Sequence, residues 1–139
     1  MKQEIRVGVV CIARKTFDFQ AAAEIYAGLQ QQLQKIDQVA WEFIPELVIE
    51  IADAQNAAQA LAAKLVDALV IISGTFALGH LALELNKVVQ KPILLWALEE
   101  LPYNGGKIRL NSVCGVNLNG SNLYRSEEHT SELQSRQVI

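Results

Sequence analysis

Short runs of apolar residues alternate along the chain with longer segments in which apolar residues recur at every third or fourth position. The first run, IRVGVVCIA at residues 5–13, is almost continuously apolar, which is typical of a strand buried on both faces of a parallel sheet. Three later runs have the same character. The pattern predicts strands at residues 5–13, 39–44, 68–72 and 93–98.

The segments between the runs have helical periodicity. Residues 18–35 carry apolar side chains at every fourth position, with Asp18 or Thr16 as the N-cap. Residues 53–64 are rich in alanine, the residue with the highest helix propensity, and Asp53 is placed to cap them. We therefore expect a helix after each of the first two strands.

A third helical segment, residues 77–90, follows the third strand after a tight loop. Strands that alternate with helices predict a single α/β domain, a three-layer sandwich with a parallel sheet of about four strands, Rossmann-like or flavodoxin-like. We expect the strand order 2-1-3-4. Asn104-Gly105-Gly106 predicts a turn that leads into residues 107–110.

Composition narrows the class of protein. The 139 residues are 51% hydrophobic and 19% charged, as in a globular domain, and the net charge of −3 with no basic stripe gives no support for nucleic-acid binding. No apolar run reaches the roughly 18 residues that span a bilayer, and the N-terminus has no signal-peptide pattern. We expect a cytoplasmic protein with reduced Cys11 and Cys114, a bridge between them being the alternative.

The last residues differ from the rest. Residues 125–135 read RSEEHTSELQS and have neither helical nor strand periodicity. A polar, disordered terminus is one interpretation. However, this peptide also resembles the translation of a common short-read sequencing adapter. We therefore expect residues 125–139 to be a non-native tail and residues 1–124 to be an N-terminal fragment of a longer protein.

Polar residues follow the predicted strands at the edge where ligands bind in open α/β sheets. Ser73, Gly74 and Thr75 offer two hydroxyls and the free N–H groups of a helix start, which suit an oxygen-rich ligand. An aromatic ring there can stack on the C–H face of a sugar. The candidate contacts are Arg14 and Lys15 after the first strand, Ser73, Thr75 and Phe76 after the third, and Trp96, Glu99 and Glu100 around the end of the fourth.

Each candidate also has an ordinary structural explanation. Arg14 and Lys15 fit solvated loop charges, and Phe76 and Trp96 fit core aromatics. Ser73 and Thr75 fit helix caps equally well, a role compatible with ligand binding. These alternatives stay open at the level of sequence.

No catalytic constellation is evident in residues 1–124. His80 lies on the face opposite the leucines of its helix and fits a solvated or interface position. Cys114 falls in a polar turn, residues 111–115, without a His-Asp pair nearby. The dinucleotide, P-loop, CxxC and HExxH motifs are missing, as is a cluster of His and carboxylates at metal spacing.

Three motifs taken together carry a resemblance to a known family. They are SGTF at residues 73–76, LLWA at 94–97 and NSVCGVN at 111–117. In this order and spacing they resemble the N-terminal domain of the L-fucose/L-arabinose isomerase family, in particular its branch of L-fucose isomerase-related proteins. The likeness covers nearly all of residues 1–124.

The resemblance implies an aldose–ketose isomerase that uses a divalent ion, typically manganese, and carboxylates to move protons through an enediol. It places the metal ligands in later domains, so this chain would hold no catalytic residue and bind no cofactor alone. It also implies a homo-oligomer in which this domain helps form a neighbouring subunit's pocket. Arg14 resembles the family's basic residue facing substrate, and Phe76 its aromatic contact.

The sequence therefore predicts a substrate-pocket and assembly domain for a small-molecule sugar, with Arg14, Ser73, Thr75, Phe76 and Trp96 as the substrate-binding residues. The loop SGTF departs from the cysteine- and tryptophan-containing loop of characterised fucose isomerases, so the sugar itself is left open. The alternatives are a non-catalytic flavodoxin-like sugar-binding or small-molecule-binding module, and a pure interaction domain that forms oligomers through its helix faces.

Overall fold

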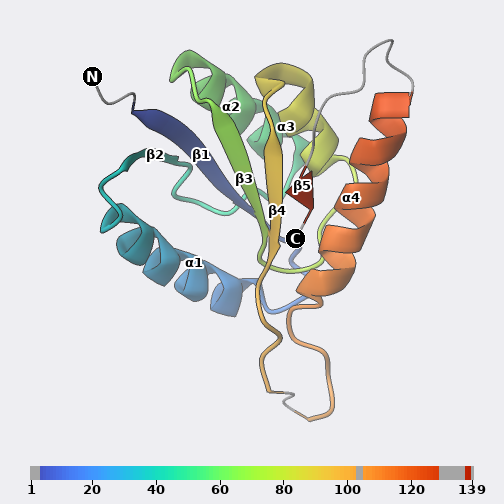
Figure 1. Cartoon of the computed structure of the whole chain (residues 1–139). Helices are drawn as coiled ribbons and strands as arrows, with labels where there is room; N and C mark the ends of the chain where they lie inside the picture. The colour runs from blue at the N-terminus through green and yellow to red at the C-terminus, as the bar shows by residue number, and fades with distance from the viewer. Residues whose placement is uncertain (1–3, 103–104, 129–136, 139) are drawn as a thin grey trace.

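The computed structural model describes residues 4–102, 105–128 and 137–138. Strands and helices alternate along the chain, as the sequence predicts (Figure 1). In order, the elements are β1 (Ile5–Ile12), α1 (Phe19–Gln34), β2 (Val39–Phe43), α2 (Ile51–Ala63), β3 (Ala68–Ser73), α3 (Leu81–Val89), β4 (Ile93–Ala97), α4 (Ser112–Glu128) and β5 (Gln137–Val138).

All neighbouring strands are parallel, and the sheet has the order β2-β1-β3-β4-β5. This confirms the predicted α/β class and the order of the first four strands. It is the flavodoxin-like order of doubly wound sheets. The helix α1 covers one face of the sheet, and α2, α3 and α4 cover the other (Figure 1).

The alternation of side chains along β1 builds both halves of the core. Val9 and Cys11 pack on the α1 face, whereas Val10 and Ile12 pack toward α2 and α3. Each of these side chains is fully buried. Burial raises the pKa of the Cys11 thiol to about 12, so this cysteine is a protonated core residue. Cys11 and the exposed Cys114 are both free, as expected.

Two helices begin elsewhere than predicted. The N-cap of α2 is Glu50, and Asp53 sits three residues on, where its carboxylate accepts the Glu50 N–H at 2.9 Å in a capping box. The helix α3 begins at Leu81 rather than residue 77. The preceding loop is tied elsewhere, since the Phe76 N–H donates to the Leu110 carbonyl at 2.8 Å and Gly79 accepts from the Asn122 amide at 2.9 Å.

The prediction of a polar turn at residues 111–115 is wrong, because α4 begins at Ser112. The face that this helix buries repeats with helical spacing but is only partly apolar, which hides it from a search for an apolar stripe. The helix continues to Glu128, and β5 lies at Gln137–Val138, so regular structure extends into the polar tail. That the tail is non-native stays a prediction. Over residues 112–126, the buried residues of α4 are Ser112, Gly115, Val116, Asn119 and Leu123.

Within the described part of the chain, no helix has both the length and the apolar character needed to cross a membrane.

Tyr26 joins α1 to the first two strands. Its buried hydroxyl donates to the carbonyl of Ile44 at 2.6 Å and to that of Val9 at 3.2 Å. Desolvation of the hydroxyl is the largest cause of a raised Tyr26 pKa, so the group stays a donor. We predict that Tyr26→Phe lowers the free energy of unfolding by roughly 1–3 kcal/mol, since the part-buried Ile44 carbonyl loses its Tyr26 donor, whereas the Val9 carbonyl keeps the Ile44 N–H. Urea denaturation measures this loss.

The matched control for Tyr26→Phe is Tyr124→Phe, because the Tyr124 residue is 63% exposed. It should leave the free energy of unfolding unchanged. Equal effects of the two substitutions would contradict the role assigned to the Tyr26 hydroxyl.

Candidate functional site

The ends of β1 and β3 meet at the carboxyl edge of the sheet and are joined there by the loop after β3. The Gly74 N–H donates to the Ile12 carbonyl at 2.9 Å, which extends the pairing of the two strands by one residue. The Arg14 N–H donates to the Thr75 hydroxyl oxygen at 2.8 Å. The loop after β1, which carries Arg14 and Lys15, is therefore fixed in place by Thr75.

Ser73 and Thr75 are fully buried, which favours their structural role. The Thr75 hydroxyl accepts from Arg14 and donates to the Phe76 carbonyl at 2.8 Å, so its hydrogen-bonding capacity is used inside the protein. The Ser73 hydroxyl accepts from the Asn119 amide of α4 at 3.4 Å. In this conformation neither hydroxyl reaches the surface of the edge.

Arg14 and Lys15 lie exposed at the same edge. Within residues 4–102, 105–128 and 137–138, neither side chain forms a hydrogen bond or an ion pair. An arginine held by its backbone and free at its guanidinium can present donors to an anion or a sugar hydroxyl. The structure thus leaves Arg14 available while fixing its position.

The structure separates the two predicted aromatic contacts. Phe76 is half-buried beside Phe17, with ring centroids 6.2 Å apart and an interplanar angle of 55°. Trp96 lies within β4 and packs against the apolar cluster between the sheet and α1. Phe76 therefore belongs to the edge that carries Arg14, whereas the half-buried Trp96 packs on the core at the α1 face of the sheet, and its contact with substrate stays a prediction. Phe17 is missed by the sequence search, because a lone aromatic in a polar loop gives no periodic signal.

An ion pair that the sequence analysis does not predict lies at one side of the carboxyl edge. The Arg109 guanidinium donates to the Asp18 carboxylate at 2.8 and 3.1 Å, and the Asp18 N–H donates to the Arg109 carbonyl at 2.9 Å. The hydrogen bond from Arg109, then the Ala21 N–H, lower the pKa of Asp18. The pair links the start of α1 to the connection between β4 and α4, residues 91 apart in sequence.

Glu100 anchors the connection that leads into α4. Its carboxylate accepts the N–H groups of Leu101, Leu110 and Asn111 at 3.0, 2.9 and 2.8 Å. Partial desolvation raises the pKa of Glu100, but these backbone donors outweigh it and the net shift is downward. Glu100 is therefore a structural anchor rather than a proton donor at neutral pH.

The described residues include no group of three or more His, Cys, Asp or Glu side chains that could hold a metal ion. His80 is exposed at the N-cap of α3 and makes no capping hydrogen bond with its side chain. Its predicted solvent-facing position is confirmed. The described residues therefore do not fit a divalent-metal centre by themselves.

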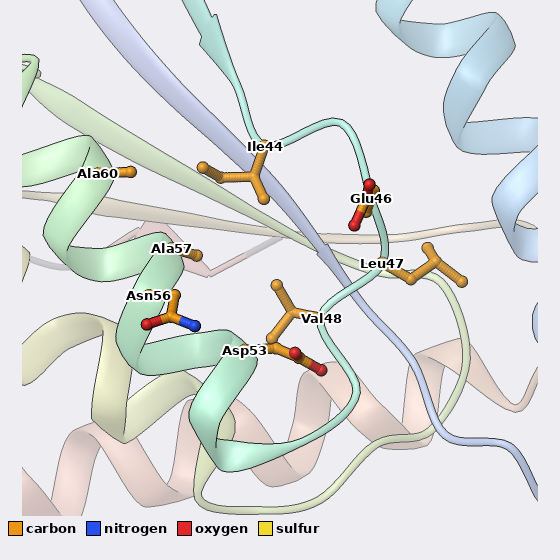
Figure 2. Close-up of a pocket in the computed structure, with 8 residues that line it drawn as sticks. All are labelled: Ile44, Glu46, Leu47, Val48, Asp53, Asn56, Ala57 and Ala60. Carbon is orange, nitrogen blue, oxygen red and sulfur yellow. The ribbon is translucent and has the colours of Figure 1, made fainter.

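A separate hollow of about 280 Å³ lies between α2 and the connection from β2 (Figure 2). Glu46, Asp53 and Asn56 supply its polar groups around an apolar floor that includes Val48 and Ala57. Asp53 is engaged in the cap of α2. None of the residues predicted to bind substrate lines this hollow, so it is distinct from the edge at Arg14.

A comparison with models of protein families shows to which family this chain is related. The family model of the fucose/sulfoquinovose isomerase N-terminal domain matches residues 8–138. The chain belongs to this family. No curated protein and no solved structure matches the chain.

Membership of the fucose/sulfoquinovose isomerase N-terminal domain family confirms the resemblance carried by the three sequence motifs. The match also runs through residues of the polar tail. Two of the three motifs lie at the structural junction just described, since SGTF forms the loop after β3 and NSVCGVN begins α4. In this domain these two motifs connect the loop after β3 to α4 at the carboxyl edge of the sheet.

Gly74 leaves no room for a side chain. A Cβ there would lie 2.7 Å from the Cys11 sulfur, 3.1 Å from the Ala22 Cβ and 3.2 Å from the Ile12 carbonyl oxygen. We predict that Gly74→Ala destabilises the domain by roughly 1–3 kcal/mol through overpacking, measured by chemical denaturation. The control is Gly28→Ala in α1, where nothing lies within 4 Å. It should stabilise by about 0.5–1 kcal/mol, and stabilisation by both variants would contradict the steric account.

The Glu100 anchor predicts a dependence of stability on pH. Because its folded pKa is below the ordinary value of 4.5, the anchor contributes stability above that value and loses it as pH falls through the folded pKa. We predict that Glu100→Gln is less stable than the wild type at pH 7 and loses less stability on acidification. Thermal unfolding between pH 7 and pH 3 measures both changes. Parallel pH profiles would refute the anchor.

Proposed function

We propose that this domain supplies a substrate-contacting edge and an assembly surface to a cytoplasmic, homo-oligomeric aldose–ketose isomerase. The observation that carries the proposal is the exposed Arg14 side chain on the loop that also carries Phe17, whose ring packs on Phe76, in a domain of this isomerase family. Fucose and sulfoquinovose, named in the family description, are both sugars. The ligand class is therefore a small monosaccharide.

The chemistry of the edge suits a sugar. The Arg14 guanidinium offers N–H donors to hydroxyl, ring or acidic oxygens, and its backbone N–H is anchored on Thr75. Phe76 presents an aromatic surface at the same loop, against which the C–H face of a sugar ring can pack. Arg14 binds and orients the sugar, and Phe76 limits water at the edge. Ser73 and Thr75 support this edge from within.

The proton transfer itself requires groups beyond the described residues. Isomerisation of an aldose moves a proton between adjacent carbons and needs a base, an acid and polarisation of the oxygens. A divalent ion such as manganese would supply the polarisation. The described residues include no group of side chains that could bind such an ion. We propose that residues outside this chain hold the ion and move the proton.

The experiment uses the full-length natural protein that contains this domain. We predict that Arg14→Ala raises KM for the isomerised sugar by about tenfold or more, the loss of a charge-assisted hydrogen bond of roughly 1.5–3 kcal/mol. Steady-state ketol-isomerase assays across fucose, arabinose and sulfoquinovose measure the change.

The control for Arg14→Ala is Lys64→Ala, which removes an exposed cation beyond the end of α2, at the opposite edge of the sheet. It should leave KM unchanged. If Arg14→Ala leaves KM unchanged as well, the assigned contact is wrong.

A non-catalytic sugar-binding or small-molecule-binding module is the second candidate, favoured by the flavodoxin-like strand order. Sugar binding by the full-length protein without any isomerisation would support this candidate and reject the isomerase.

A further inference from the structure

The helix α4 is the longest in the described chain, yet it buries few apolar side chains. Over residues 112–126 only Val116 and Leu123 are large apolar residues at buried positions. The nine-residue α3, by contrast, buries Leu81, Ala82, Leu85 and Val89. The hydrophobic stabilisation that holds α4 on the sheet is therefore smaller for its length.

Hydrogen bonds replace the missing apolar contacts. The Ser112 hydroxyl donates to the Gly74 carbonyl at 3.0 Å, and the Asn119 amide donates to the Ser73 hydroxyl at 3.4 Å. Ser73, Ser112 and Asn119 are buried, as is the neighbouring Thr75, and they lie at one junction. We name this junction, the Ser73 hydroxyl and the Gly74 carbonyl of the β3 loop with Ser112 and Asn119 of α4, the polar seam.

The residues of the polar seam pack closely, but little free energy is needed to separate them. The helix α4 packs closely on the loop at Gly115, where a Cβ would lie at the limit of ordinary contact, 3.4 Å from the Ser73 hydroxyl and the Thr75 carbonyl oxygen. Water can replace each hydrogen bond of the seam when it opens, so the net contribution of each bond is small. Water cannot replace the contacts of buried aliphatic side chains in the same way.

The backbone before α4 is suited to act as a pivot. Asn111 has φ of 57°, a left-handed conformation that asparagine tolerates better than most residues. The Glu100 carboxylate accepts the N–H groups of Leu110 and Asn111, directly before α4 begins. These bonds fix the backbone that leads into Asn111.

We propose that α4 detaches from the end of β3 as a cooperative unit, turning at Asn111, while β1, β3 and the helices α1 to α3 remain folded. Opening exposes the Ser73 hydroxyl and the Gly74 carbonyl at the carboxyl edge, next to Phe76. The polar seam thus controls access to groups that are closed to a ligand in the present conformation. This proposal does not rest on the assigned isomerase function.

Native-state hydrogen exchange of the 139-residue chain, followed against urea, tests the proposal. We expect amides of residues 116–126 to exchange at least about tenfold faster than those of β1 and β3, with a weaker dependence on urea, as for a separate unit of opening. Coincident rates and urea slopes for α4 and the strands would overturn it.

A pair of variants tests the polar seam itself. Asn119→Ala removes a seam hydrogen bond and should speed exchange of α4 about fivefold, whereas Asn117→Ala changes the exposed face of the same helix and should have no such effect. Equal exchange in the two variants rejects the seam. Should Asn119→Ala fail to fold, the wild-type urea dependence still decides whether α4 opens alone.

Discussion

The structure depends on the contact between the ends of β1 and β3, made by the residues Ser73 to Phe76. Gly74 must lack a side chain so that its N–H reaches the Ile12 carbonyl while the chain passes Cys11 and Ala22. The Thr75 hydroxyl then accepts the Arg14 N–H. The Ser73 hydroxyl and the Gly74 carbonyl accept hydrogen bonds from α4. One loop therefore sets the position of the exposed cation, an aromatic side chain and the last long helix.

Sequence pattern predicts the sheet because apolar runs and helical periodicity both report burial directly. Asp18 caps α1 as expected, accepting the Ala21 N–H at 3.2 Å. The helix α4 escapes the same search, since its buried stripe runs through Ser112, Gly115 and Asn119. Only the partners of these residues on the β3 loop show why that stripe is buried, and sequence periodicity carries no information on partners so far away in the chain.

The candidate site, too, can be predicted only in part from the sequence. The position of Arg14 at a strand end is sufficient to predict its exposure at the carboxyl edge. Burial of Ser73 and Thr75, however, depends on a helix that the sequence does not reveal. The Asp18–Arg109 pair joins distant segments, and Glu100 binds backbone N–H groups without a sequence preference of their own. Such contacts arise from the fold and become visible only with it.

The central claim is that the loop from Ser73 to Phe76 presents Arg14 to a sugar in the assembled isomerase. The most direct measurement is a crystal structure of the full-length protein soaked with its preferred sugar. The account predicts a sugar oxygen within hydrogen-bonding distance of the Arg14 guanidinium, in the pocket of the same or a neighbouring subunit. A sugar bound entirely by other domains, with Arg14 facing solvent in every subunit, would contradict it.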